Sequence, residues 1–354
     1  MGQHAKRPQD HRPGWRRFVV AGVAGAVVVG GVASVAAATT RGPSSDQHRF
    51  AGPAAHLGPV VGNPDRAAAV TVTGTSGAKA TTTATFQTMA VATDMTATVS
   101  AAEGSTVGVG SPITIRFNRS VPAANQGSVL SHLSIAESQP VPGGWHWFSD
   151  RELHFRPQSF WPTGEQITVT TNLDGWNAGN DHWGSGQSTT HLGIGASHVT
   201  VADLAAKEMT VTNNGQTIAT YPISGGSSRY PTQDGIHIAL DKEPVVHMVS
   251  TTVGIPSRGP GGYDEFVYND VHISDTGEYV HDAPWSQGSQ GRVNVSHGCI
   301  NLGPNDSKAF YDLSQIGDVI EVVGGTRSPE SGDHGVMDWT LDWSQWTPGT
   351  VAQA

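Results

Sequence analysis

The 354-residue sequence contains one cysteine and few charged residues, which make up 14% of the chain. A single cysteine forms no intramolecular disulfide, so a small fold held together by disulfides is excluded. Scarce charge also argues against long helices stabilised by charge pairs four residues apart. The 44 glycines and 21 prolines favour short strands and turns. We therefore expect a mainly β protein, and its length exceeds the roughly 100–200 residues of one common domain, which predicts two folded units.

Positive charge is scarce outside the N-terminal end. The first 17 residues hold one acid, Asp10, and five basic side chains: Lys6, Arg7, Arg12, Arg16 and Arg17. Of the 20 basic and 30 acidic residues of the whole chain, 15 basic and 29 acidic follow position 17, a net charge of −14. Because nucleic acids are bound through positive charge, nucleic acid is not an expected partner.

Residues 18–38 carry no charge and follow the basic segment 1–17. These 21 residues are close to the roughly 20 that cross a bilayer as a helix, which predicts a transmembrane anchor. Small residues at 36–38 also fit the cleavage site of a secretory signal, so both interpretations stay open. The basic residues place 1–17 in the cytoplasm and the rest on the cell-wall side of the plasma membrane, anchored or secreted. No cysteine follows that could carry a lipid, so a lipoprotein is not expected.

The next two regions differ in composition. Residues 39–95 are rich in Ala, Thr, Ser, Gly and Pro, which predicts a flexible spacer because little apolar surface is available to offset ordering entropy. The stretch 70–72 is the one sign of strand structure in it. Residues 96–197 carry apolar residues at alternate positions, such as Ile113 and Ile115, which predicts an immunoglobulin-like β-sandwich. Three tryptophans there are expected to be packing residues and not a sugar-binding platform: Trp145, Trp147 and Trp161.

A second β-rich unit is expected over 198–324. The dipeptide Asn214-Gly215 suits a two-residue turn with positive φ, so 207–223 is predicted to form a hairpin. A strand over 319–323 is expected to close the unit. The extension 325–354 is expected to pack on this domain through its tryptophans: Trp339, Trp343 and Trp346.

One short helix is expected in the second unit. It runs from Asn305 to about Ile316, with Asn305 or Asp306 as its cap and Gly317 as its end. The predicted fold class is thus mainly β: an immunoglobulin-like sandwich, then a β-rich domain with one short helix and a Trp-rich extension.

Cys299 requires an explanation, because a free thiol outside the cell is a reactive liability. It lies in the run Ser296-His297-Gly298-Cys299-Ile300-Asn301, and His281 precedes it by 18 residues. A cysteine nucleophile needs a base or a positive field to form thiolate, and a further group to fix the tautomer of the base. Gly298 allows a tight turn that would expose backbone amides beside the thiol, as an oxyanion hole requires. The run therefore predicts acyl transfer through Cys299.

Two other interpretations of Cys299 compete with that of a nucleophile. A lone buried cysteine is commonly a small apolar core residue. A zinc site is the other, because Cys299 could share a metal with His272, His281 and His297. Neither the C-x-x-C nor the H-E-x-x-H pattern accompanies them, so zinc is disfavoured.

The residues around Cys299 carry a family resemblance. The sequence resembles the active-site signature of the YkuD-type L,D-transpeptidase domain in the block Tyr279-Val280-His281-Asp282-Ala283-Pro284-Trp285-Ser286 and in the run from Ser296 to Leu302. The most specific feature is the order of a histidine, a gap, Ser-His-Gly-Cys, one residue and Asn. The resemblance extends from about 198 to the C-terminus, and the preceding sandwich is similar to the accessory module of actinobacterial members.

This resemblance implies roles for individual residues. Cys299 would be the nucleophile and His281 its general base, oriented by a main-chain carbonyl near Asp282. Further site residues are implied by position: His297 at the catalytic centre, Tyr263 as a lid residue, Met248 and Trp285 at the donor pocket, and Ser296, Gly298 and Asn301 in the loop. Relatives often have Ser where this chain has Asp282. If its carboxylate approached His281, the pKa of the imidazole would rise.

The resemblance also implies a reaction. The thiol attacks a peptidoglycan stem tetrapeptide at its third residue, releases the terminal D-Ala, and leaves a thioester that the side-chain amine of a neighbouring stem resolves into a 3→3 cross-link. No metal or organic cofactor is implied, and carbapenem β-lactams are expected to acylate the same thiol. Hydrolysis by an L,D-carboxypeptidase and D-amino-acid exchange stay open as alternatives, and a non-catalytic wall-binding protein is a more distant one. A papain-like peptidase is disfavoured, because there the cysteine precedes the histidine.

Overall fold

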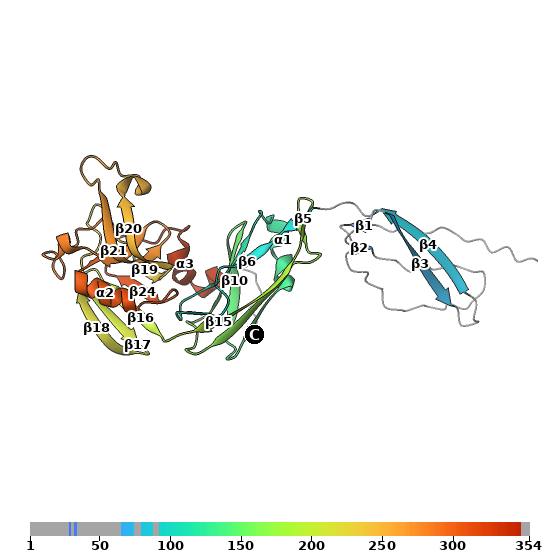
Figure 1. Cartoon of the computed structure of the whole chain (residues 1–354), viewed down its shortest axis with the longest axis horizontal. Helices are drawn as coiled ribbons and strands as arrows, with labels where there is room; N and C mark the ends of the chain where they lie inside the picture. The colour runs from blue at the N-terminus through green and yellow to red at the C-terminus, as the bar shows by residue number, and fades with distance from the viewer. Residues whose placement is uncertain (1–27, 30–31, 34–64, 74–78, 88–91, 348–354) are drawn as a thin grey trace, which may run out of the picture. The chain divides into compact units, whose positions relative to one another are not determined.

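The computed structural model divides the chain into two units, 1–90 and 91–354 (Figure 1). The residues described are 28–29, 32–33, 65–73, 79–87 and 92–347. In the first unit β1 (Val28–Val29) pairs with β2 (Val32–Ala33), and β3 (Asp65–Thr73) with β4 (Lys79–Gln87). The predicted basic segment 1–17, most of the predicted anchor or signal 18–38 and much of the predicted spacer 39–95 lie outside the described residues. In the described part of the chain, no helix is long and apolar enough to cross a membrane.

The second unit begins with an immunoglobulin-like sandwich. One sheet has the strand order β10-β11-β8-β6 and the other β7-β15-β12-β9, with a small third sheet β13-β14-β5. The bounds are β5 (Ala92–Met95), β6 (Ala97–Val99), β7 (Ser105–Val107), β8 (Ile113–Phe117), α1 (Ala123–Gln126), η1 (Ser128–His132), β9 (Leu133–Glu137), β10 (Gly143–Ser149), β11 (Glu152–Pro157), β12 (Gln166–Asn172), β13 (Asn177–Gly179), β14 (His182–Gly184) and β15 (Gln187–Ile194).

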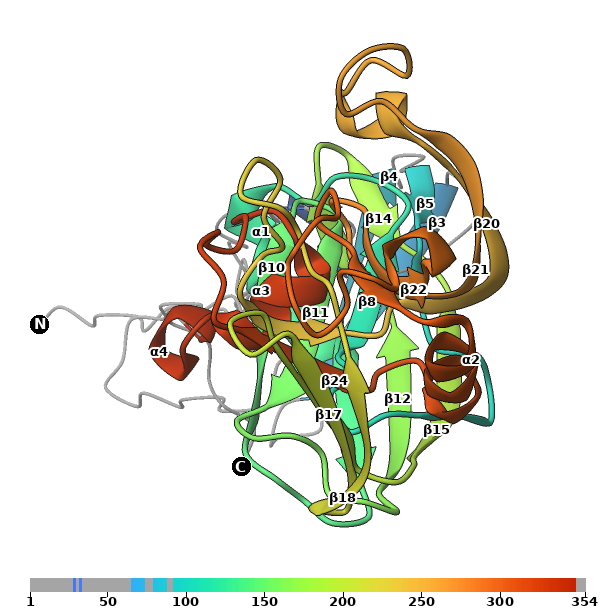
Figure 2. The ribbon, with the colours of Figure 1, turned by 90° about the vertical axis from the view of Figure 1, so that its left-hand side faces the viewer.

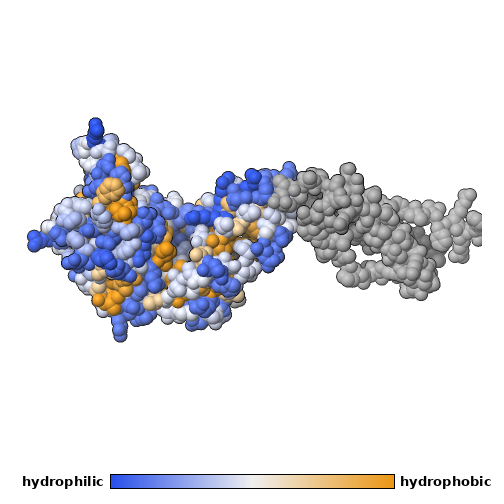
Figure 3. All heavy atoms as spheres, viewed as in Figure 1, coloured by the Kyte–Doolittle hydropathy of each residue, from blue (hydrophilic) through white to orange (hydrophobic). Residues whose placement is uncertain are grey.

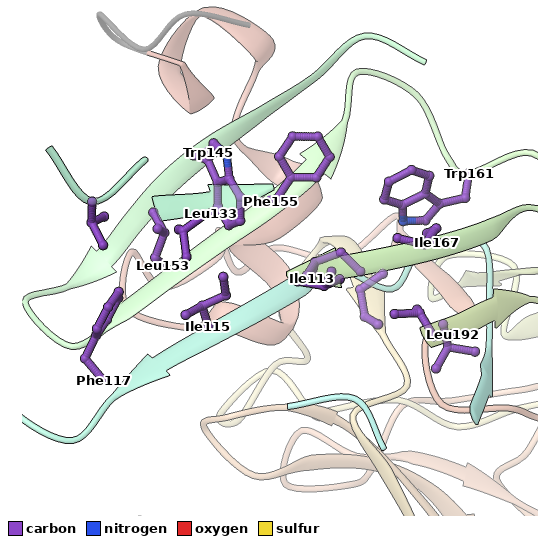
Figure 4. Close-up of a cluster of buried hydrophobic side chains, with 14 of the residues drawn as sticks. Ile113, Ile115, Phe117, Leu133, Trp145, Leu153, Phe155, Trp161, Ile167 and Leu192 are labelled. Carbon is purple, nitrogen blue, oxygen red and sulfur yellow. The ribbon is translucent and has the colours of Figure 1, made fainter. Parts of the chain in front are cut away.

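Alternating apolar residues build the core of this sandwich, as the sequence predicts. On β8 and β11, Ile115 faces Leu153 in register, and both are buried against β12 residues such as Ile167 (Figure 4). Trp145 and Trp161 are each 2% exposed. Trp147 stacks on Phe117 at 5.3 Å. The prediction that these tryptophans are packing residues is therefore confirmed.

The second domain of this unit, residues 198–323, consists of two sheets with a core between them. The five-stranded sheet has the order β18-β17-β16-β24-β19 and the four-stranded sheet β20-β21-β22-β23. Figure 2 shows the long β20–β21 hairpin projecting from this unit. The bounds are β16 (His198–Asp203), β17 (Glu208–Asn213), β18 (Gln216–Pro222), β19 (Gly235–Ile238), β20 (Asp241–Val249), η2 (Ser250–Val253), β21 (Asp264–Ser274), β22 (Glu278–Asp282), η3 (Pro284–Ser286), β23 (Ile300–Leu302), α2 (Pro304–Leu313) and β24 (Val319–Val323).

The predicted hairpin is present as β17–β18, and its turn residues Asn214 and Gly215 have φ of 49° and 79°. The predicted helix is present as α2, but its predicted caps are wrong. Pro304 occupies the first helical turn and Gly303 is the N-cap, because the ring of proline presets a helical φ. The helix also ends before Ile316, since Ser314 is extended and its hydroxyl donates to the carbonyl of Phe310 at 2.6 Å.

The C-terminal extension adds two helices that the sequence analysis did not predict, α3 (His334–Thr340) and α4 (Trp343–Trp346). Helix α3 packs on β19 and β21. Trp339 and Trp346 are buried against the sandwich, where their indole N–H groups donate to Gly110 O at 2.7 Å and Gly144 O at 2.9 Å. The extension thus contacts both the second domain, residues 198–323, and the sandwich.

Candidate active site

The register of two parallel strands brings the predicted nucleophile and base to one face of the four-stranded sheet. On β22 and β23, His281 lies beside Asn301 and Val280 beside Ile300. Val280 and Ile300 are fully buried in the core. Because side chains alternate along a strand, His281 and Cys299 lie on the opposite face from these two residues. Cys299 directly precedes β23, and the backbone N–H of Tyr279 faces its thiol, so His281 lies two residues farther along β22 on the same face.

The loop before β23 is fixed by its own hydrogen bonds. The Ser296 hydroxyl donates to Cys299 O at 2.6 Å and accepts from Gly298 N at 3.1 Å. Thr232 Oγ1 donates to Gly298 O at 2.7 Å. Gly298 has a φ of +126°, a conformation that favours glycine. The Gly298 amide is therefore engaged by Ser296, and the exposure of other amides beside the thiol stays a prediction.

Cys299 is a half-buried residue, and its thiol lies beside acidic side chains. Its Sγ donates to Gly277 O at 3.9 Å. Burial raises the pKa of Cys299 to about 12, and the backbone N–H of Tyr279 opposes this effect. Nearby negative charges raise it further, in the order Glu278, Asp270 and Glu265. At neutral pH the group is therefore a neutral thiol, without the positive field that would stabilise a free thiolate.

His281 is poised as a neutral imidazole. It is buried, and its Nδ1 lies 2.9 Å from Asp282 O, to which it must donate because a carbonyl only accepts. This leaves the lone pair of Nε2 free to accept a proton. Burial lowers the pKa of His281 to about 4. The partner is the main-chain carbonyl of Asp282 and not its carboxylate, while Trp285 lies 6.2 Å away ring to ring and is 56% exposed.

The His297 ring contacts two tyrosine rings. Its ring centroid is 4.7 Å from that of Tyr230 and 5.2 Å from that of Tyr263. Burial raises the pKa of Tyr263 to about 12, and the charges of Cys299 and Glu265 add to the effect. Tyr263 therefore keeps its O–H at neutral pH and can donate a hydrogen bond. Tyr230 belongs to this group of rings, and no motif in the sequence pointed to it.

Asn301 and Met248, the remaining predicted residues, have different environments. Asn301 is buried, its Nδ2 donates to Ser286 Oγ at 3.2 Å, and its backbone N–H donates to Ser224 O at 2.9 Å. It therefore anchors β23 to neighbouring segments. Met248 is half-buried on β20, opposite Glu265 of β21. Farther along the hairpin, apolar side chains reach the surface (Figure 3), with Val245 at 42% and Phe266 at 61% exposed.

Glu278 is the main site residue that the sequence analysis missed. It is 3% exposed and lies on the same face of β22 as Val280, which packs in the core. A charged residue at an inward strand position was the available signal, because buried charges require partners. Its partner Arg327 is 49 residues away in the C-terminal extension. Neither spacing nor motif connects the two.

The residues weighed for zinc do not gather at one point. His272 Nδ1 pairs with Asp241 at 3.2 Å and its ring stacks on Tyr279 at 4.4 Å. Among the described side chains, one group could bring three ligand atoms together: Glu152, His154 and His334, whose atoms lie within 4.8 Å of one another.

Hydrogen bonds already engage this group, which joins β11 to α3. His154 Nδ1 pairs with Asp338 at 2.8 Å and its Nε2 with Glu152 at 3.0 Å, and the two carboxylates, against burial, raise the pKa of His154 to about 9. Arg116 Nη2 contacts the same Glu152 oxygen at 3.0 Å. A doubly hydrogen-bonded imidazolium beside a guanidinium is an ion-pair network and a poor metal site.

Comparisons with known proteins agree with this architecture. The model of a bacterial Ig domain matches residues 64–177, and that of an L,D-transpeptidase catalytic domain matches 197–322. The chain is similar to L,D-transpeptidase 2 of Mycobacterium tuberculosis strain CDC 1551 / Oshkosh, with 37% identity over 78% of this chain and 67% of that protein. It is 34% identical to L,D-transpeptidase 1 of M. tuberculosis strain H37Rv over 64% of this chain and 84% of that protein.

A solved structure is similar as well. It is that of an L,D-transpeptidase in complex with imipenem, with a TM-score of 0.57 and 34% identity over 64% of this chain and 97% of that one. Fold and matches together define a two-module enzyme, an Ig domain followed by an L,D-transpeptidase catalytic domain. The chain belongs to the L,D-transpeptidase family. The family resemblance and the mainly β fold class predicted from the sequence are confirmed.

Proposed function

We propose that this L,D-transpeptidase joins peptidoglycan stem peptides by acyl transfer through Cys299, with His281 as general base. The observation that supports it most is the shared face of β22 and β23. There a buried imidazole, held through Nδ1 by Asp282 O at 2.9 Å, lies on the same face as the sole cysteine, two residues along β22 from the position opposite it. Membership in the family supports peptidoglycan as the substrate class.

The two pKa values favour proton transfer during attack over a preformed ion pair. With the thiol near 12 and the imidazole near 4, both groups rest neutral at pH 7. As sulfur bonds to the donor carbonyl carbon, the thiol proton passes to His281 Nε2. Collapse of the tetrahedral intermediate breaks the peptide bond, and the departing D-Ala amine takes the proton from His281. The product of this half-reaction is a thioester on Cys299.

The second half-reaction mirrors the first. The side-chain amine of a second stem attacks the thioester, gives its proton to His281, and releases the neutral thiol with a 3→3 cross-link. Tyr263, protonated and near Cys299, is proposed to donate its O–H to the oxyanion. Exposed Trp285 and half-buried Met248 are proposed to contact the donor stem. Carbapenems are proposed to acylate the same thiol, since a relative was solved with imipenem.

The proposed location is outside the cytoplasm. Residues 18–38 would anchor the chain in the membrane or direct its export, and 39–95 would act as a spacer. The proposed boundaries of the folded parts are 96–197 for the sandwich, 198–324 for the catalytic domain and 325–354 for the extension. A cell-wall position fits an enzyme that uses stem peptides.

Incubation of the full-length chain with a disaccharide-tetrapeptide tests this function. Mass analysis should show a dimer lighter by one D-Ala, and Cys299→Ala should give none. Conversion to tripeptide alone would instead assign the chain as an L,D-carboxypeptidase. Dimer formation by Cys299→Ala would overturn the assignment of the nucleophile.

A further inference from the structure

An ion pair lies directly behind the loop that carries Cys299, formed by residues that the proposed mechanism does not use. The Glu278 carboxylate is buried, and a Cβ built on Gly298 would lie 3.2 Å from its Oε1. It therefore packs on the backbone of the residue before the thiol. Arg327 Nη1 contacts the same oxygen at 2.8 Å, and the backbone N–H of Gln233 donates to it at 3.1 Å.

Arg327 is itself fixed in place from several sides. Its main-chain carbonyl accepts from Asp234 N at 2.8 Å, and the backbone of Arg327 forms an isolated β-bridge with that of Gln233. Its Nη1 also donates to Pro231 O at 3.4 Å, and its Nη2 pairs with the exposed Glu330. The guanidinium thus approaches the Cys299 loop in one defined direction from the C-terminal extension.

The extension also contacts the segment whose carbonyl accepts from the thiol. Asp333 Oδ2 accepts from Gln233 Nε2 at 3.0 Å, and its Oδ1 accepts from Asp275 N at 3.0 Å. Gln233 Nε2 donates to Thr276 Oγ1 at 2.8 Å. Thr276 precedes Gly277, whose carbonyl accepts from the thiol. Residues 327–333 therefore reach the surroundings of Cys299 twice: Arg327 through Glu278 at Gly298, and Asp333 through Gln233 and Thr276 next to Gly277.

We propose that Arg327 is a positioning residue for Cys299, which holds the Glu278 carboxylate against the nucleophile loop and neutralises its charge beside the thiol. The proposal rests on the proposed role of Cys299. In a buried setting a lone carboxylate is unfavourable, so one partner without the other disturbs the loop. The C-terminal extension would thus contribute to the reactivity of the active site as well as to packing.

The charges near Glu278 determine whether a variant makes the Cys299 thiol more or less reactive. Besides Arg327 these are Glu330, Asp333 and the Cys299 thiol. Burial raises the pKa of Glu278 to about 8, and Arg327 is the main opposing influence. An ionised Glu278 without Arg327 disfavours thiolate, whereas removal of the Glu278 charge favours it. The two single variants should therefore change thiol reactivity in opposite directions at a pH where Glu278 of the Arg327 variant is ionised, which lies above 8 because Arg327 no longer lowers its pKa.

The test is the rate of iodoacetamide alkylation of the full-length chain between pH 7 and 10, since Cys299 is its sole cysteine. Above pH 8, Glu278→Gln should react faster than wild type by roughly 3- to 10-fold, in the range expected for one nearby charge. Because Arg327 lowers the pKa of Glu278, Arg327→Met raises that pKa above about 8. This variant should therefore react slower by a similar factor only toward pH 10, where its Glu278 ionises. The double variant should return to within about twofold of wild type.

Glu330→Gln is the matched control, because it removes the exposed partner of Arg327 and leaves the Glu278–Arg327 pair. Glu330 acts weakly on Glu278, so the rate of this variant should change far less than that of either single variant. If Arg327→Met does not fold, Arg327→Lys keeps the charge and should react like wild type. Changes of the same sign in both single variants, or no change in folded protein, would overturn the proposal. Alkylation reports on the thiol directly, so these results hold even if Cys299→Ala retains cross-linking and the proposed function fails.

Discussion

At the scale of single residues, burial has opposite effects on the two groups of the candidate site. It raises the pKa of the thiol and lowers that of His281, because both charged forms lose hydration. The positive field expected around a cysteine nucleophile is replaced here by acidic neighbours. Reactivity must then depend on a base that removes the proton as the bond forms.

His281→Ala should therefore slow acylation by a carbapenem by roughly 10²-fold or more at pH 7, the range for loss of a general base. His297→Ala is the natural comparison, because His297 packs against Tyr230 and Tyr263 and should affect binding more than the proton transfer. Stopped-flow measurement of both variants checks this. A larger loss in His297→Ala would reverse the two roles.

On the acidic side of its pH profile, kcat/KM should fall only at an unusually low pH. His281 acts as a base only when neutral, so activity should fall as the pH drops through about 4, the lowered pKa of this residue. Asp282→Ser is the matched control: it keeps the carbonyl that holds Nδ1 and should leave the limb in place. A limb near 6.5, the ordinary value for histidine, would show that His281 is not the buried base described.

The candidate site was predictable from the sequence as far as its residues lie in local motifs. Cys299, His281 and the loop 296–301 fall within a short block that a resemblance can identify. Tyr230 and Arg327 reach the site only through tertiary packing, and nothing near them in the sequence marks them. The engagement of the Gly298 amide by the Ser296 hydroxyl, two residues away, was likewise not visible in the sequence.

At the scale of elements, the nucleophile loop depends on one backbone conformation. Gly298 has a φ of +126°, and a Cβ there would crowd Glu278 Oε1 at 3.2 Å. Gly298→Ala should therefore lower the free energy of unfolding by about 1–3 kcal/mol and reduce acylation, since strain of this kind moves Cys299. Chemical denaturation and carbapenem acylation rates measure the two effects. Gly104→Ala, with positive φ but open space around its Cβ, is a control that should affect stability alone.

The strands were easier to predict than the helices. Alternation identified β8, β11 and β12, and Asn214-Gly215 identified the β17–β18 turn, because these signals are local. Helix α2 began earlier than predicted, as Pro304 fits the first helical turn. Helix α4 was missed although Asp342 and Gln345 form a capping box, a signal that its short length and many tryptophans obscured.

At the scale of the whole second unit, the extension joins the sandwich to the catalytic domain. Trp346 is fully buried, donates to Gly144 O, and lies 4.6 Å from the Arg156 guanidinium. Trp346→Ala should lower the free energy of unfolding by about 3–5 kcal/mol, as other truncations of buried aromatic residues do. Hydrogen exchange should report faster exchange in β10 and α4. Trp343→Ala should have a smaller effect because Trp343 is more exposed; equal effects would contradict the packing described.

The most direct test of acyl transfer through Cys299 is the intact mass of the full-length chain, quenched during turnover of a disaccharide-tetrapeptide. The account predicts an adduct of the donor stem minus one D-Ala on wild-type protein, localised to Cys299, and none on Cys299→Ala. It also predicts that His281→Ala forms the same adduct more slowly. A wild-type protein that forms cross-links without this adduct, or carries it on another residue, would contradict the account.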